Sequence, residues 1–440
     1  MSFEATYKVA DLIASSKLWI GDGYRAKNSE LGSSGIPFAR AGDINDGFHF
    51  KSGDHLPESD SWKAGNKLSE VGDVVFTSKG TVGRFGYVTE SIRRFVYSPQ
   101  LCFWRSLDNE VIHPRFLFYW IQGKEFYGQY KSVSRKTDMA EYVSLSDQRA
   151  MEIILPNFDQ QRAIAHILGT LDDKIELNRK TNDTLEAMAK ALFKSWFVDF
   201  DPVRAKAEGR PSGLPAEISD LFPDSFEDSE LGEIPSGWAI AEINQIVNLK
   251  RDSIDPSVTP DEIFDHYSIP AFDSGKNPAK ELGSSIKSQK FLIGDEDLLV
   301  SKLNPSIPRI WIPFSSSGRR SICSTEFLVC QASSDVGQAF AYCLASSDSI
   351  IEVMTGLAGG TSNSHQRIRP GDFLALDCCI GSQQVRSAFS DVVEPLLRKT
   401  LALRSESRSL VSTRDALLPK LISGEIRIPD AEKMLEEVGV

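Results

Sequence analysis

The chain has 440 residues, which exceeds the ~100 to 200 residues of an ordinary single domain, so two or three domains are expected. Hydrophobic residues make up 41% and charged residues 25%, a balance that excludes a disordered or membrane-embedded chain. The net charge of −12 argues against wrapping nucleic acid by overall charge, although residues 1–155 carry 19 basic and 19 acidic residues.

Residues 1–155 are predicted to form a strand-rich domain, because short apolar runs alternate there with Gly, Pro, Asn and Asp. The first residues lack the basic and apolar regions of a signal peptide, and the longest apolar run, at 116–121, is too short to span a bilayer. A cytoplasmic location is therefore expected. The six cysteines form no C-x-x-C pair, which favours free thiols over a zinc site.

A glycine-rich segment, KGTVGRFG, follows the strand predicted at 71–78. Its glycines could shape an ordinary hairpin, or they could let the backbone approach a DNA phosphate that the neighbouring cations neutralise. Two further basic clusters in this domain could equally be solvated surface. The DNA-binding candidates of the first domain are Ser78, Lys79, Thr81, Arg84, Arg93, Arg94, Arg135 and Lys136.

A long helix is predicted within residues 156–200, beginning near Asp159 and ending near Phe197, before Pro202. Apolar positions recur at alternating spacings of four and three, as in the seam of a coiled coil. Two asparagines interrupt the seam, which favours one specific partner and register. The seam positions are Ile164, Leu168, Leu171, Ile175, Asn178, Asn182, Leu185, Leu192 and Trp196.

Residues 201–232 are expected to form an acidic linker, since 201–230 hold 3 basic and 8 acidic residues. A second strand-rich domain is expected at 233–380, because three segments of the first copy recur in the same order. The matches pair VGDVVFTSK (71–79) with IGDEDLLVSK (293–302), RFLFYWIQ (115–122) with AFAYCLAS (339–346), and DQQRAIAHIL (159–168) with SQQVRSAFSD (382–391). The chain is therefore predicted to be an internal duplication.

The second copy carries its own polar and basic clusters, in a region with 12 basic and 18 acidic residues at 231–380. Asn, Gln and Arg are the side chains that can pair bidentately with base edges in the major groove. The candidates of the second domain are Lys302, Asn304, Arg309, Arg319, Arg320, Asn363, His365, Gln366 and Arg367.

A second long helix is predicted at 381–424, followed by a tail at 425–440. Its thinner seam consists of Phe389, Leu396, Leu403, Leu410 and Leu417, with polar residues at the alternate positions. Pro395 should kink this helix or mark its start. Both stripes could belong to ordinary amphipathic helices on separate cores, but the duplication favours a mutual pair. The prediction is an α+β fold, with two strand-rich domains separated by a pair of long antiparallel helices.

Sequence motifs for catalysis are absent. There is no D-P-P-Y clamp of an adenine methyltransferase, no E-x-K after either Pro-Asp pair, no Walker A loop and no H-E-x-x-H. We therefore expect no catalytic residue, no metal site and no cofactor on this chain.

Residues 155–202, LPNFDQQRAIAHILGTLDDKIELNRKTNDTLEAMAKALFKSWFVDFDP, resemble the central conserved region of type I restriction-modification specificity subunits. SELGEIPSGW (229–238) and LLPKLISGEI (417–426) are similar to the entry of that family's second recognition domain and to its C-terminal conserved end. The resemblance implies two target-recognition domains, 1–155 and 233–380, that read a bipartite site in double-stranded DNA. It also implies methyltransferase subunits docked on the long helices and restriction (translocase) subunits, with S-adenosylmethionine, ATP and Mg²⁺ held by these partners, which methylate adenine or cut.

Two other functions remain alternatives. A methyltransferase or nuclease that acts alone would show methyl transfer by the purified chain. A scaffold that binds protein would show no salt-sensitive binding to a specific duplex.

Overall fold

The computed structural model describes residues 5–44, 47–50, 53–79, 83–133, 135–137, 140–314, 318–359, 366–437 and 439. The chain folds into two compact units. The first comprises Met1–Glu176 and Arg408–Val440, and the second comprises Leu177–Ser407. In the described ranges, no helix is both long and apolar enough to cross a membrane.

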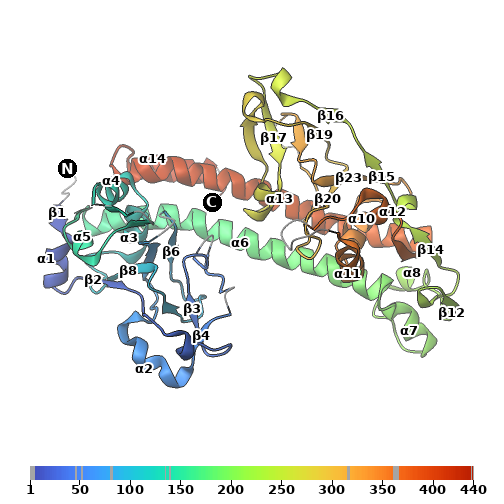
Figure 1. Ribbon diagram of the computed structural model, residues 1–440, viewed down its shortest axis with the longest axis horizontal. Coiled ribbons are helices and arrows are strands. Elements are labelled where there is room, and N and C mark those ends of the chain that lie inside the picture. Colours follow the sequence, from blue (N-terminus) through green and yellow to red (C-terminus); the bar gives the residue numbers. More distant parts are fainter. Residues whose placement is uncertain are drawn as a thin grey trace. The chain divides into compact units, whose positions relative to one another are not determined.

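The first unit is built on an antiparallel sheet in the order β2-β8-β5-β6, of which β2, β8 and β6 are labelled in Figure 1. These strands are β2 (Leu18–Asp22), β8 (Leu101–Ser106), β5 (Val74–Thr77) and β6 (Phe85–Tyr87). A smaller sheet places β3 (Ile36–Ala39) between antiparallel β4 (His55–Leu56) and parallel β7 (Val96–Tyr97). Two further strands, β1 (Ala5–Lys8) and β11 (Glu152–Leu155), pair with each other. The helices of this domain include α1 (Val9–Ala14), α2 (Ser61–Ala64), α3 (Pro114–Ile121), α4 (Lys124–Val133) and α5 (Leu145–Arg149).

The second unit repeats this plan. Its four-stranded sheet has the order β15-β23-β20-β21, formed by β15 (Val247–Lys250), β23 (Phe327–Ala332), β20 (Asp297–Ser301) and β21 (Ile310–Trp311). A parallel pair again lies in the other sheet, between β17 (Ile263–Tyr267) and β22 (Ser321–Cys323), joined there by β16 (Ser253–Ile254), β18 (Ala279–Leu282) and β19 (Lys290–Ile293). The remaining pair is β14 (Ala239–Glu242) with β24 (Asp377–Ile380), and the domain's helices include α9 (Ile269–Asp273), α10 (Gln338–Ala345), α11 (Asp348–Leu357) and α12 (Pro370–Leu374).

The shared strand order confirms the internal duplication and also corrects one of its three matches. Leu155 and Ile380, which end equivalent strands, lie 225 residues apart. The sequence match of 159–168 with 382–391 is therefore two residues out of register. The side chain of Gln161 donates to the carbonyl of Pro156, and Arg386 donates to that of Gly381, so these two residues are the true equivalents. Two adjacent glutamines in each copy misled the comparison.

The two predicted long helices are α6 (Phe158–Phe197) and α13 (Gln383–Ile422), each 40 residues long (Figure 1). Within the second unit they pack antiparallel, since Asn178 donates to the hydroxyl of Ser407 at 3.3 Å while Phe193 contacts Phe389. Within the first unit, Arg414 of α13 pairs with Asp172 of α6 at 2.8 Å. The predicted fold class is confirmed.

Most predicted seam positions are buried, namely Ile164, Leu168, Leu171, Asn178, Asn182, Trp196, Phe389, Leu403, Leu410 and Leu417. Ile175, Leu185, Leu192 and Leu396 are only half-buried. Near the start of α13, Val385, Phe389, Val393 and Leu397 are buried at successive spacings of four, so Leu397 replaces Leu396. Pro395 lies inside α13 on its exposed side and does not mark the helix start.

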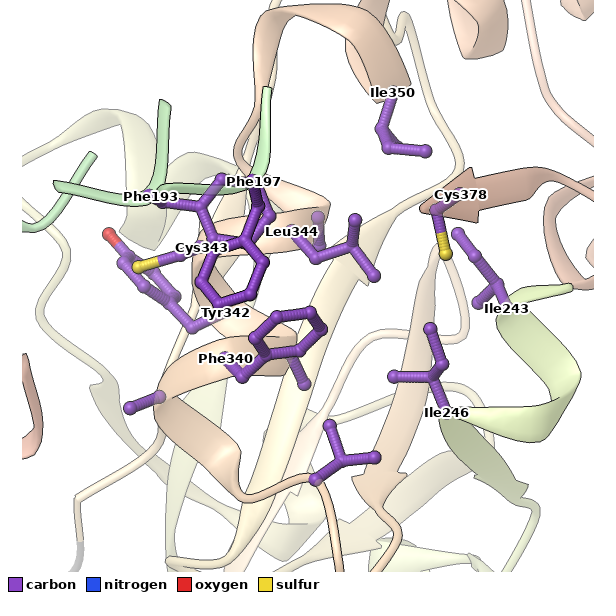
Figure 2. Packing of buried hydrophobic residues seen from close by; sticks show 14 of the residues in the cluster. Phe193, Phe197, Ile243, Ile246, Phe340, Tyr342, Cys343, Leu344, Ile350 and Cys378 are labelled. Carbon is purple, nitrogen blue, oxygen red and sulfur yellow. The ribbon is translucent and has the colours of Figure 1, made fainter. Parts of the chain in front are cut away.

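Each core combines segments from both copies. In the first unit, Leu168 of α6 shares a cluster with Leu417 of α13 and with Leu435 of α14 (Ile428–Glu437). In the second, Phe193 and Phe197 of α6 lie beside Phe340 and Leu344 of α10 (Figure 2). Neither core is complete with the residues of one copy alone.

The acidic segment 201–232 is folded rather than solvated along its length. It forms α7 (Asp201–Ala207), α8 (Ala216–Ser219) and β12 (Phe226–Ser229), which pairs with β13 (Gly232–Pro235). Val203 and Phe222 are buried in the core of the second unit. Its acidic residues therefore lie on the outside of a packed segment.

Candidate nucleic-acid interface

A buried carboxylate anchors one inner strand of the four-stranded sheet in each domain. These strands, β5 in the first domain and β20 in the second, are called the central strands. Asp73, before β5, accepts hydrogen bonds from the guanidinium of Arg105 at 2.6 Å and from the hydroxyl of Tyr97 at 2.5 Å. Its equivalent, Asp297, accepts from the ammonium of Lys250 at 2.9 Å. Each carboxylate also accepts the backbone N–H three residues before it. The central strands thus have a common anchor, but the cation comes from the adjacent strand β8 in the first domain and from β15, two strands away, in the second.

The carboxyl end of each central strand is held by the same three backbone hydrogen bonds. In the first domain, the N–H groups of Thr77, Ser78 and Val143 donate to the carbonyls of Arg84, Gln100 and Ser78. In the second, those of Ser301, Lys302 and Ile368 donate to the carbonyls of Arg309, Glu326 and Lys302. Three loops therefore meet in each domain: the hairpin after the central strand, the turn before β8 or β23, and the segment before α5 or α12. We call this place the loop edge.

The first domain presents only part of its predicted set at the loop edge. Lys79 is exposed there, whereas Ser78 is buried and Arg84 donates to the carbonyl of Ala41 at 2.8 Å. Thr81 lies outside the described residues. Arg135 and Lys136 belong to β9 (Arg135–Thr137), which pairs with β10 (Ala140–Tyr142) just before Val143.

The second domain presents Gln366 and Arg367 at the equivalent place. The exposed Arg367 pairs with Glu326 at 3.0 Å, and the carbonyl of Gln366 accepts the N–H of Asn304. Arg309 is buried and forms a bidentate pair with Asp273, at 2.7 and 2.8 Å. Lys302 is half-buried, and Asn363 and His365 lie outside the described residues.

Four predicted arginines lie elsewhere, at the amino ends of β7 and β22. Arg93 and Arg94 are exposed, and Arg93 donates to the carbonyl of Gly35. Arg319 pairs with Asp265 at 3.0 Å, and Arg320 pairs with Glu262. Because β7 and β22 run toward the turns that carry Gln100 and Glu326, their amino ends lie at the opposite strand ends from the loop edge.

Gln100 and Glu326 were not predicted from the sequence, and they occupy equivalent positions in the turns of the two loop edges. Extending the repeat match from the central strand to the strands at 101–106 and 327–332 would have found them. A glutamine and a glutamate can accept hydrogen bonds from different base edges, since glutamine pairs with adenine and glutamate accepts from cytosine.

Among the described residues, the side chains named at the loop edges can donate or accept hydrogen bonds. Burial raises the pKa of the Cys323 thiol to about 12 and that of Cys379 to about 11, which leaves both protonated and weakly nucleophilic. Within the described part of the chain, no group of three or more His, Cys, Asp or Glu side chains is placed to hold a metal ion.

Comparison with known proteins agrees with this architecture. Residues 7–187 match the model of the type I restriction modification DNA specificity domain. The HindI specificity subunit of Haemophilus influenzae is 25% identical over 417 residues, which cover 82% of this chain and 88% of the relative. The MjaIX specificity subunit of Methanocaldococcus jannaschii is 24% identical, covering 83% and 80%. The solved S subunit of the type I restriction-modification system of M. genitalium has the same fold, with a TM-score of 0.57, 15% identity and 96% coverage of both chains.

Proposed function

Because the chain belongs to the family of type I restriction-modification specificity subunits, we propose that each of its two domains reads one half of a bipartite DNA target. The observation that carries this proposal is the pair of equivalent loop edges. The backbone hydrogen bonds are the same in both domains, whereas the side chains around them differ. Two copies of one scaffold with different side chains suit two different half-sites.

Recognition on this proposal divides into positioning and reading. Exposed cations such as Lys79 contact phosphates and supply salt-dependent affinity, and polar side chains such as Gln100 and Gln366 reach base edges. Arg309 and Arg84 act mainly by holding the loops, since their guanidinium groups bind the protein itself.

Partner subunits supply the chemistry on this proposal. Methyltransferase subunits dock on α6 and α13 and hold S-adenosylmethionine, and restriction subunits add ATP- and Mg²⁺-dependent translocation and cleavage. The specificity subunit brings them to adenines in its target, in the cytoplasm. Support comes from the family and from the lack of catalytic motifs in the sequence.

Mapping of methylated adenines tests the proposal. Genomic DNA from cells carrying the gene is compared with DNA from cells in which it is deleted. We expect one bipartite motif, two unlike half-sites separated by an unread spacer, to lose methylation completely. A matched strain with residues 233–380 replaced by the equivalent domain of a relative should keep the first half-site and change the second. The proposal would be contradicted if the deletion removed methylation from a continuous motif, or if it removed methylation from no motif.

A further inference from the structure

The hairpin between β20 and β21 ends in a rigid turn, Asn304–Ile307. The N–H of Ile307 donates to the carbonyl of Asn304 at 2.8 Å, and the N–H of Asn304 donates to that of Gln366 at 2.8 Å. Arg309, fixed by Asp273, donates to the carbonyl of Ile307 at 3.3 Å. Pro305 and Pro308 restrict the backbone on both sides. The tip is therefore held in one conformation.

This tip presents an aliphatic side chain where turns ordinarily carry Gly, Asn, Asp or Ser. Ile307 is 54% exposed. The first domain has a similar residue in its sequence, since Val82-Gly83-Arg84 corresponds to Ile307-Pro308-Arg309 at the 225-residue spacing of the duplication. Val82 lies outside the described residues, but its place in the sequence shows that both copies put a β-branched aliphatic residue two positions before the arginine.

We propose that Ile307 contacts the methyl group of a thymine in the half-site read by the second domain, which rests on the proposed function. Apolar contact with this methyl is one way in which side chains read the major groove, and polar groups that read neighbouring bases lie at the same loop edge. The carbonyl of Gln366 accepts the N–H of Asn304 in the hairpin, and Arg367 forms an isolated β-bridge with Leu303. A β-branched side chain has few rotamers, so little freedom is lost on contact.

Replacement of thymine by uracil tests this contact, because uracil lacks only the methyl group. The full-length chain is titrated with duplexes that carry the mapped target, with each thymine of the second half-site replaced in turn. We expect wild-type affinity to fall roughly three- to fivefold at one position, the value of one lost apolar carbon. Ile307→Ala should bind the thymine and uracil duplexes equally, and Ile307→Val should keep most of the preference.

Val258→Ala is the matched control, because Val258 is 77% exposed in another turn of the same domain and should retain full thymine preference. Thermal unfolding of all three variants should match the wild type. The inference is overturned if Ile307→Ala retains the thymine preference, if it weakens all duplexes alike, or if the second half-site contains no thymine. Absence of any specific binding by the wild type would instead contradict the proposed function itself.

Discussion

Glu186 joins three elements of the second unit through a buried charge cluster. Its carboxylate on α6 pairs with Arg404 of α13 and with Lys276, which follows α9, at 2.9 Å. Only 17% of the Glu186 side chain is exposed, with 16% of Arg404 and 28% of Lys276. The negative charge of this one carboxylate therefore stabilises two cations that have lost most of their contact with water.

Glu186→Gln should strongly destabilise the second unit, because it leaves two neighbouring cations without a counter-charge. Breaking a buried pair by removing one partner costs about 3 to 5 kcal/mol. The glutamine oxygen still accepts a hydrogen bond, so we expect a loss near the lower limit, ~3 kcal/mol. At a typical urea dependence of ~1 to 3 kcal/mol per molar, the unfolding midpoint should fall by roughly 1 to 3 M.

Urea titration of the full-length chain, followed by hydrogen exchange of peptides from each unit, measures this effect. Peptides of the second unit should lose protection first in Glu186→Gln. Asp183→Asn is the control, since Asp183 is 68% exposed beside Arg179 on the same helix and should cost ~0.5 kcal/mol or less. Equal shifts for the two variants would refute the argument, as would strict additivity of Glu186→Gln and Lys276→Gln.

The same cluster predicts a dependence on pH. Burial raises the pKa of Glu186, but Arg404 and Lys276 lower it more, so the folded value lies below the usual 4.5. A carboxylate with a depressed folded pKa contributes stability above its unfolded pKa and loses it as pH falls through the folded value. The wild type should therefore lose stability below about pH 4.5 through a component that is absent from Glu186→Gln.

Three further predictions concern assembly and binding. A chain ending near residue 210 should sediment as a dimer, with Asn182 of one copy taking the place of Ser407 opposite Asn178, and with methyltransferase subunits it should modify a symmetric site; a folded monomer would contradict the helix pair. Lys79→Ala should weaken binding to every duplex and lower the salt slope by about one unit, whereas lost discrimination at one base would make Lys79 a base reader. Calorimetry of the purified chain should show no stoichiometric site for S-adenosylmethionine or ATP; either site would revive an enzymatic function.

The sequence predicted the long helices well because their heptad spacing is strictly local. It failed where side-chain partners come from distant segments. Glu406 is one of the polar residues at the alternate positions of the second seam, yet its carboxylate accepts a hydrogen bond from Asn178, 228 positions away in sequence. Leu396 and Leu397 are adjacent leucines, and only packing against α6 shows that Leu397 is the buried one.

The candidate interface was predictable only as a set of residue types. Exposed Lys79 and Arg367 fit the pattern of a DNA-binding loop, but buried Arg309 fits it equally well in sequence. What distinguishes them is burial, because Arg309 is buried beside Asp273, 36 positions away, whereas Arg367 stays exposed although it pairs with Glu326. Sequence patterns give the charge of a side chain, but they do not give its exposure or the residue with which it pairs.

The core of the first unit combines residues from both ends of the chain, and this has a consequence for protein synthesis. Residues 408–440, which complete that core, leave the ribosome after the intervening 231 residues have been made. At ~5 to 20 residues per second, the nascent first domain waits about 12 to 46 seconds with Leu168 and Leu171 uncovered. During this interval it is a natural client for chaperones. A chain whose translation stops early can cover these leucines only by pairing with the long helix of a second copy, so an unpaired fragment exposes apolar surface that the complete core buries.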